Sequence, residues 1–407
     1  MNPRTLIAFS SLLLILLLAL HSAAIGDDCA LVGATVYPSP TGPSIPDAVV
    51  LTSGGKITAV GSRAAVKYPA SVRVIDCAGK VIVAGFWNSH VHFADNTWPD
   101  AANAPASGLA KHMQEMLTRW GFTTVWDLGS DPNNSLALRR RVESGEIPGP
   151  RIFLAGNEFP KGGHPVYLPP EMQLPEVASP DEAAQLAQNY LRMGLDAIKL
   201  FTGSYMGNKP VINMDTSIVK AAVNVAHGVN KPVFTHPQNR TGVDNALAGG
   251  VDILAHTVPT EPDFTADELA RFKTQHTALI PTLTLWTTVA QDPAVASGLV
   301  ASGVQQLKTF FANGGAILFG TDVGFTPNYD TALEFELMRR ALSVNEILAS
   351  LTTNPAAYFK ALSKGRVEKG FDADLVVLDG DPASDVRNFA KVAYTIRAGK
   401  MIYQHQP

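Results

Sequence analysis

The middle of the chain alternates between two hydrophobic patterns. Short apolar runs rich in Val, Ile, Ala and Leu are separated by longer stretches whose apolar residues recur at helical spacing, and this alternation is typical of parallel βα units. We predict helices at residues 180–193, 217–227, 266–274 and 303–312. Eight strands are predicted, at residues 82–91, 123–127, 152–156, 197–201, 232–235, 251–255, 278–282 and 316–321.

Eight consecutive βα units predict an α/β fold built as a closed (β/α)8 TIM barrel, which has its active site where the strands end. The predicted barrel occupies residues 85–362. An open, doubly wound sheet is the alternative, but its Gly-rich phosphate-binding motif is missing after the first predicted strand. The pattern therefore favours the barrel.

Both ends of the mature chain have a different pattern. Residues 25–84 and 363–407 contain short β-rich runs punctuated by turns, which is typical of a small sheet domain. We predict that the two segments together form a small β-sandwich domain beside the barrel. Cys29 and Cys77 lie in the first segment, where they form either a disulfide or two buried thiols.

Residues 1–24 are predicted to be a signal peptide. Arg4 precedes an apolar run that ends in Ser22-Ala23-Ala24, a small-residue pattern at which leaders are cleaved. The run is short for a membrane span, and an uncleaved membrane anchor is the alternative. We expect the protein to be exported, to the periplasm or outside the cell, and to have no membrane association after cleavage.

The charge of the mature chain argues against a nucleic-acid partner. Removal of Arg4 with the leader leaves 31 basic and 36 acidic residues, a net charge of −5. No basic run or basic stripe interleaved with aromatic residues is present, although phosphate binding requires one. We therefore expect a small molecule as the partner.

Residues that can bind metal occur at the carboxyl ends of five predicted strands. In His90-Val91-His92, the two-residue repeat of a strand places both imidazoles on one side. The spacing of the candidates corresponds to whole βα units of about 30 residues, apart from one short step, and assigns them to strands one, four, five, six and eight. The candidates are His90, His92, Lys199, His236, His256 and Asp322.

Imidazoles and a carboxylate are ligands that Zn²⁺ or Mn²⁺ prefers. Lys199 is the exception, because an ammonium group has no lone pair to offer. One interpretation is a lysine that extends from the strand end to solvent. The other is a buried lysine whose pKa is lowered by neighbouring cations, so that the neutral amine captures CO₂ and the carbamate bridges two metals.

The sequence resembles the metal-dependent amidohydrolase superfamily, in its imidazolonepropionase-like and Xaa-Pro (Xaa-Arg) dipeptidase-like branch. The resemblance covers nearly the whole mature chain. It implies two divalent ions, Zn²⁺ with Mn²⁺ as the alternative, the first held by His90, His92 and Asp322, the second by His236 and His256, and both bridged by carbamylated Lys199. The motifs are Gly85-Phe86-Trp87-Asn88-Ser89-His90-Val91-His92, Ile198-Lys199-Leu200-Phe201, Gly320-Thr321-Asp322 and Gly370-Phe371-Asp372-Ala373-Asp374-Leu375-Val376-Val377.

The resemblance also implies a reaction, which is hydrolysis of an amide-type C–N bond in a dipeptide or an N-acyl amino acid by a metal-bridging hydroxide. Asp322 would be catalytic, accepting a proton from water and passing it to the leaving amine. His164, in a Gly-Gly-His loop, and Tyr205 resemble substrate-binding residues of the dipeptidase-like members. Exposed loop side chains are the alternative interpretation of both.

Two other functions remain open at this point. One is a mononuclear deaminase or cyclic-amide hydrolase on the same barrel, in which Lys199 has no role. The other is a binding protein that kept the barrel without catalysis. His236 is followed by Pro237-Gln238, where relatives often carry small residues, so the substrate is not identified. A homo-oligomer is also left open.

Overall fold

The computed structural model describes residues 28–172 and 174–405, so the predicted signal peptide lies outside the described residues. Within those residues, no helix combines the length and the apolar character needed to cross a membrane. The strands form two large sheets and one short hairpin.

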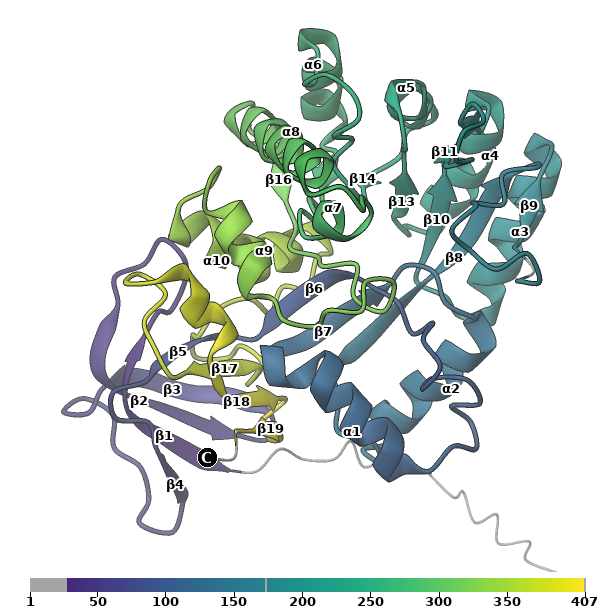
Figure 1. Cartoon of the computed structure of the whole chain (residues 1–407). Coiled ribbons are helices and arrows are strands. Elements are labelled where there is room, and N and C mark those ends of the chain that lie inside the picture. The colour runs from purple at the N-terminus through teal and green to yellow at the C-terminus, as the bar shows by residue number, and fades with distance from the viewer. Residues whose placement is uncertain (1–27, 173, 406–407) are drawn as a thin grey trace, which may run out of the picture.

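The first sheet is built from both ends of the chain, as the sequence predicted. β17 pairs antiparallel with β5, with Val376 opposite Val83, so the C-terminal strands extend the N-terminal sheet. Figure 1 shows these yellow and purple strands side by side. The strands are β1 (Cys29–Val36), β2 (Ile45–Ser53), β3 (Lys56–Ser62), β4 (Arg73–Asp76), β5 (Val81–Ala84), β17 (Leu375–Leu378), β18 (Val392–Arg397) and β19 (Lys400–Gln404).

The second sheet is parallel and curled, and its main strands follow one another in chain order. This confirms the predicted α/β architecture. Two-residue β9 (Glu176–Val177) adds to β8, and β11 (Gly203–Ser204) with β12 (Ile212–Asn213) forms the separate hairpin. The eight strands are β6 (Phe86–Val91), β7 (Phe122–Asp127), β8 (Arg151–Pro160), β10 (Ala197–Phe201), β13 (Val233–His236), β14 (Ile253–Leu254), β15 (Ala278–Leu279) and β16 (Ala316–Ile317).

Backbone hydrogen bonds also join the two ends of this curled sheet. The amide of Ser89 donates to the carbonyl of Phe319 at 2.7 Å, and the amide of Asp322 donates to the carbonyl of His90 at 2.9 Å. Val91 and Val323 form a parallel bridge. The segment after β16 therefore lies directly beside β6.

The predicted first strand, residues 82–91, is in fact two strands. β5 belongs to the sheet of the chain ends and β6 to the parallel sheet. A Cβ atom at Gly85 would lie 2.3 Å from Oγ1 of Thr123, so the chain passes between the sheets where no side chain fits. The prediction of one continuous strand is wrong for that reason.

Helices cover the outside of the parallel sheet (Figure 1). α3 matches its prediction, because Ser179 caps its first turn and Gly194 ends it at φ 93°. α8 begins ten residues earlier than predicted, after the capping residue Asp292. The helices are α1 (Ala106–Met116), α2 (Pro132–Glu143), α3 (Pro180–Met193), α4 (Thr216–His227), α5 (Arg240–Gly249), α6 (Ala266–Gln275), α7 (Leu285–Thr288), α8 (Pro293–Ala312), α9 (Ala332–Met338), α10 (Val344–Leu351) and α11 (Thr353–Tyr358), with short 3₁₀ turns at Thr118–Trp120 and Val386–Ala390.

Aromatic rings fill the interior of the curled sheet below the strand ends. The ring centroid of Trp126 lies 4.8 Å from that of Phe153 and 4.7 Å from that of Phe359. Trp87 lies 5.9 Å from Phe359 in a stacked arrangement. The interior is therefore a packed core, and open space for a ligand is restricted to the carboxyl ends.

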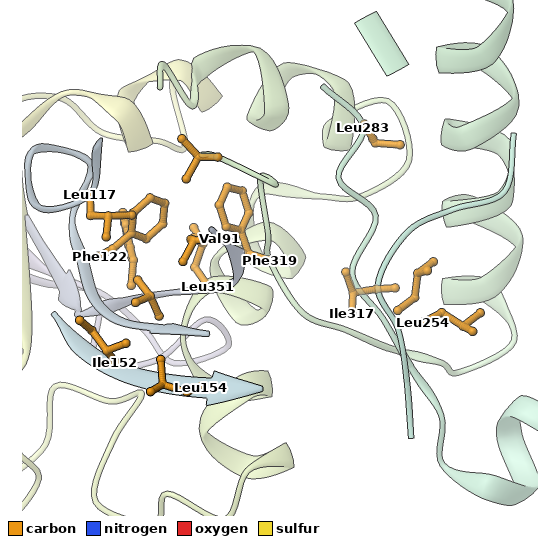
Figure 2. Close-up of a cluster of buried hydrophobic side chains, with 14 of the residues drawn as sticks. Val91, Leu117, Phe122, Ile152, Leu154, Leu254, Leu283, Ile317, Phe319 and Leu351 are labelled. Carbon is orange, nitrogen blue, oxygen red and sulfur yellow. The ribbon is translucent and has the colours of Figure 1, made fainter. Parts of the chain in front are cut away.

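A second hydrophobic layer lies between the sheet and the helices. Phe122 and Ile152 from neighbouring strands pack with Leu117 and Leu351 from helical segments, as Figure 2 shows. All four side chains are no more than 1% exposed. Burial of both strand faces explains why the parallel strands are continuous apolar runs.

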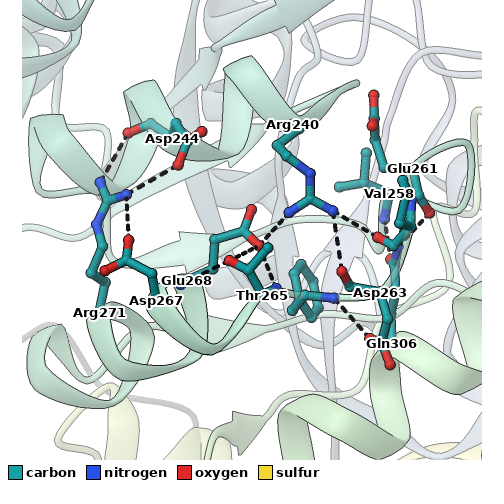
Figure 3. A network of polar contacts seen from close by, with 12 residues as sticks. Arg240, Asp244, Val258, Glu261, Asp263, Thr265, Asp267, Glu268, Arg271 and Gln306 are labelled. Atoms are coloured by element: carbon teal, nitrogen blue, oxygen red, sulfur yellow. Dashed lines mark hydrogen bonds and ion pairs between the residues drawn. The ribbon is translucent and has the colours of Figure 1, made fainter.

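A polar network fastens the loops that follow β13 and β14 (Figure 3). Arg240 forms an ion pair with Glu268 on α6 and donates to the carbonyls of Pro262 and Asp263 at 2.9 and 3.1 Å. Gln306 on α8 donates to the carbonyl of Val258 at 2.8 Å. These contacts hold two strand-end loops in fixed positions.

Both cysteines are buried thiols in the core of the first sheet, and Sγ of Cys29 contacts Oγ1 of Thr52 at 3.2 Å. Burial raises the pKa of the Cys77 thiol to about 12, so the thiol is neutral and unreactive at neutral pH. The structure thus matches the buried-thiol alternative.

Glu158 on β8 generates a prediction about stability. The side chain is 0% exposed, and neither carboxylate oxygen has a hydrogen-bond partner among the described residues. Burial raises the pKa of Glu158 from 4.5 to about 8. Between these values the folded chain keeps a proton that the unfolded chain has released, so stability falls as pH rises from about 4.5 to 8.

We predict that the free energy of unfolding falls less for Glu158→Gln than for the unsubstituted protein as pH rises over this range. The two falls should differ by about 2 to 4 kcal/mol, where the upper limit is set by the size of the pKa shift. Urea unfolding at pH 5 and pH 8.5 measures it, with the exposed Glu171→Gln as control. Equal pH dependence in both variants would show that Glu158 is ionised in the folded state.

Candidate metal centre

β6 delivers two histidines to the carboxyl end of the parallel sheet. Nε2 of His90 lies 3.1 Å from Nε2 of His92. Trp87 also faces the interior, and strict alternation along β6 would then point His90 and His92 outward. A register shift in the pairing of β6 with β7, between Asn88 and Val91, reverses the alternation, so that both histidines face the interior. Nδ1 of His90 donates to the carbonyl of Ala255 at 3.1 Å, which leaves the lone pair on Nε2.

Asp322 reaches the same point from the segment after β16. Its Oδ1 atom lies 3.1 Å from Nε2 of His90 and 2.8 Å from Nε2 of His92. The chain turns sharply here, with a φ of 59° at Asp322. Gly324 follows at φ 97°, where a Cβ atom would lie 1.9 Å from the carbonyl oxygen of His92. Glycine at 324 therefore permits the close approach that brings Asp322 to the histidines.

Asn88 joins β6 to the segment of Asp322 through hydrogen bonds, and it was not among the site residues predicted from the sequence. Its side chain is 0% exposed. Nδ2 donates to Oγ1 of Thr321 at 2.8 Å, and Oδ1 accepts from the amide of His90 at 3.1 Å. The only sign of this role in the sequence is an asparagine two residues before the first histidine of the His-x-His motif.

His236 and His256 lie beside the first pair. The ring centroid of His256 is 4.7 Å from that of His90 and 4.8 Å from that of His236. Nδ1 of His256 contacts Oγ1 of Thr282 at 2.7 Å, and Nε2 of His236 contacts Oε1 of Gln238 at 2.9 Å. Oε1 of Gln238 can only accept a hydrogen bond, so Nε2 of His236 donates and Nδ1 of His236 carries the lone pair. The contact with Thr282 orients the ring of His256.

Lys199 belongs to the same cluster and does not extend to solvent. Its side chain is 1% exposed, and within the described residues it has no hydrogen-bond or ion-pair partner. Burial, opposed by the charge of Asp322, lowers the pKa of Lys199 to about 7. The ammonium is close enough to His90, His236 and His256 to lower their pKa values as well. The buried interpretation of Lys199 is therefore the one that the geometry matches.

The protonation states of the cluster suit metal binding. Burial lowers the pKa of His90 and that of His236 to about 4, so both rings are neutral at pH 7. Burial would raise the pKa of Asp322, but the charge and proximity of His90 and His92 hold it well below its usual value. Neutral imidazoles and an ionised carboxylate are the forms that bind metal.

The donor atoms of His90, His92 and Asp322 fit one divalent ion. They all lie within 4.8 Å of one another, and their mutual distances are 2.8 to 3.1 Å. Ligand atoms about 2.0–2.1 Å from a Zn²⁺ ion are separated from one another by about 3.0–3.4 Å. The three atoms thus converge on a point where an ion can be bound.

The two predicted substrate-binding residues lie on loops at the same end of the sheet. His164 is partly buried and its Nε2 contacts the carbonyl of Leu168 at 3.3 Å. Tyr205 is 42% exposed and stacks with Tyr167, with ring centroids 6.4 Å apart. Tyr167 was not identified from the sequence, yet burial and the charge of Asp322 raise its pKa. Tyr167 and Tyr205 therefore form a pair of neighbouring rings at this end of the sheet.

A small cavity lies beside the cluster, between the loops after β15 and β16. Thr321, which precedes Asp322, forms part of its wall. Most of the lining is hydroxyl or amide, so the cavity suits a polar group of a ligand. The lining residues are Thr284, Thr287, Thr288, Thr321, Thr326, Asn328, Tyr329, Asp330 and Leu333.

Several known proteins are similar to this chain in sequence or in architecture. An ochratoxinase from Aspergillus niger is 23% identical over 370 residues, covering 79% of this chain and 75% of that protein. An allantoinase from Solibacter usitatus is 24% identical, covering 82% and 81%. Among solved structures, a Xaa-Pro dipeptidase with bound methionine in the active site superposes with a TM-score of 0.79 at 21% identity, covering 93% of this chain and all of that one.

The family assignment follows from a match over most of the chain. The sequence profile of the Amidohydrolase family matches residues 81–402, a range that begins in β5, includes the whole parallel sheet and ends in β19. All six candidate ligands lie within it. The chain therefore belongs to the amidohydrolase family and is a hydrolase that acts on carbon–nitrogen bonds.

Proposed function

We propose that this protein is an exported amidohydrolase that uses two divalent metal ions to hydrolyse an amide bond in a dipeptide or an N-acyl amino acid. Its catalytic domain is residues 85–362, a closed (β/α)8 barrel. Residues 25–84 and 363–407 form a β-sandwich beside it. Backbone bonds between β6 and the segment after β16 support closure of the barrel.

In the proposed site His90, His92 and Asp322 would hold the first ion, and His236 and His256 the second. Lys199, carbamylated by CO₂, would supply anionic oxygen ligands to both. Zn²⁺ is the proposed metal, with Mn²⁺ as the alternative, since both accept nitrogen and oxygen ligands.

The binuclear proposal rests on the buried amine of Lys199. Among the described residues this amine has no hydrogen-bond or ion-pair partner, and its Nζ lies 5.5 Å from the centroid of the Phe201 ring. An isolated ammonium inside a protein costs several kcal/mol, and burial already favours the neutral amine. Reaction of the amine nitrogen with the carbon of CO₂, with release of one N–H proton, converts this amine into an anion with two donor oxygens. A mononuclear site would leave the same amine without a hydrogen-bond or ion-pair partner, so the geometry favours two metals over one.

When bound, the two ions acidify water near neutral pH and polarise the scissile carbonyl. Asp322, ionised and adjacent to the first pair of histidines, accepts a proton from the attacking water and delivers it to the departing amine nitrogen. Thr282 and Gln238 hold the rings of His256 and His236 in the orientation described above. The aromatic core beneath the site excludes bulk water from the interior.

A substrate panel tests the proposed function. Dipeptides and N-acyl amino acids should be hydrolysed by protein purified with Zn²⁺ and bicarbonate, and a chelator should abolish the turnover. Lactams and nucleoside amines form the comparison set for a cyclic-amide hydrolase and a deaminase. Turnover confined to that set, or none in any set, would contradict the proposal.

The first prediction from the proposed function concerns the metal content of the protein. The unsubstituted protein should bind about two ions per chain, and Lys199→Ala about one, because the bridging ligand is lost. Elemental analysis after dialysis measures this, with the exposed Lys67→Ala as control. A metal content that is equal in the Lys199 and Lys67 variants, with activity retained in both, would support the mononuclear alternative.

The second prediction concerns proton transfer. Asp322→Asn should lower kcat by about 10²–10⁴-fold while most of the metal stays bound, because the amide keeps an acceptor oxygen but cannot carry a proton. Asp292→Asn is the matched control, since asparagine also caps α8. Steady-state kinetics and metal analysis together check it, and full activity in Asp322→Asn would remove the assigned role.

The third prediction concerns Gln238. Loss of the partner of His236 Nε2 should weaken the second metal by about 10- to 100-fold, so Gln238→Leu should release one ion to a competing chelator more readily. Gln238→Glu keeps an acceptor oxygen and should retain the affinity. Similar affinities in the Leu and Glu variants would mean that the hydrogen bond does not orient the ring.

A further inference from the structure

Three aromatic side chains gather at the rim of the site, and they are unusually exposed. Tyr167, Tyr205 and Phe325 are 40%, 42% and 40% exposed. Among the described residues, no other Phe, Tyr or Trp side chain reaches such exposure. The three come from the loops after β8, β10 and β16, so the fold brings them together from distant parts of the sequence.

The three rings form one cluster. Tyr167 is at its centre, stacked with Tyr205 at 17° between ring planes and packed edge to face against Phe325 with centroids 5.2 Å apart. Val166 and Met172, in the same loop as Tyr167, are 56% and 41% exposed. The three touching rings therefore expose apolar surface to solvent, which is costly unless a ligand covers it.

Backbone contacts hold the cluster in place beside the metal centre. The amide of Val166 donates to the carbonyl of Tyr205 at 3.2 Å, and the amide of Phe325 donates to the carbonyl of Asp322 at 3.2 Å. Tyr205 also directly follows β11, the first strand of the β11–β12 hairpin. The rings are thus positioned before any ligand binds, which lowers the entropic cost of recognition.

Phe325 links the cluster to the reacting atoms. It follows Asp322 by three residues and donates its backbone amide to the Asp322 carbonyl, while its ring packs edge to face against Tyr167. A group stacked on these rings would therefore lie near a bond placed over the metal centre.

We propose that Tyr167, Tyr205 and Phe325 form a subsite for an aromatic ring of the substrate, carried on a residue that flanks the scissile amide. This proposal rests on the proposed function and names its substrate class. Offset-stacked and edge-to-face ring contacts favour an aromatic group over an aliphatic one of similar size. The small hydroxyl-lined cavity, whose wall includes Thr321, lies beside the same site and suits a polar group.

Two substrate pairs test the subsite and show which side of the amide carries the ring. N-acetyl-phenylalanine is compared with N-acetyl-alanine, and N-benzoyl-alanine with N-acetyl-alanine. For one pair, kcat/KM of the unsubstituted protein should be at least about tenfold higher for the aromatic substrate. Tyr205→Ala and Phe325→Ala should each lower this ratio by about two- to tenfold, and the double variant by more. Leu362→Ala is the control, because Leu362 is an 86% exposed hydrophobic residue outside the cluster, and this variant should keep the ratio.

Binding provides a readout that does not depend on turnover. Calorimetry with L-phenylalanine and L-alanine as product probes should show tighter binding of phenylalanine, and the Tyr205 and Phe325 variants should lose the difference. If no variant hydrolyses any amide but this binding preference is found and lost as described, the proposed function fails and the subsite stands. The subsite would be overturned if the unsubstituted protein had equal kcat/KM for the aromatic and aliphatic substrates of both pairs. It would also be overturned if the ratio of the two kcat/KM values were unchanged in both aromatic variants.

Discussion

The alternation of side chains along parallel strands is the constraint on which the site depends. On β10, Ala197 is part of the inner core and Lys199 follows two residues later; on β13, Phe234 is followed by His236 in the same way. A period of two keeps these residues on one face, so the strands that bury apolar side chains at the bottom of the sheet present polar ones at its end.

This arrangement explains why a costly group is tolerated. Lys199 is buried among imidazoles and one carboxylate, without a hydrogen-bond or ion-pair partner in the described part of the chain, and such a group destabilises the fold unless it gains a ligand. The surrounding structure is rigid, because Asn88 joins β6 to the segment of Asp322 and the Arg240 network fixes the loops after β13 and β14. Packing elsewhere supplies the stability that the site does not.

Much of this was predictable from the sequence. The strand ends, the βα alternation and the six candidate ligands follow from hydrophobic periodicity and spacing, which the fold enforces over long distances. The split of residues 82–91 at Gly85 was not, because an apolar run has the same appearance in one sheet or two. Tyr167 and Asn88 were missed for a related reason: their roles depend on contacts between loops or segments far apart in the chain, which no local pattern encodes.

Crystals grown with Zn²⁺ and bicarbonate and measured at the zinc absorption edge test the central claim most directly. The account predicts two anomalous peaks about 3.5–4 Å apart, one beside His90, His92 and Asp322 and the other beside His236 and His256, with electron density extending beyond Nζ of Lys199 to both. A single peak, with Lys199 ending in a free amine, would contradict it.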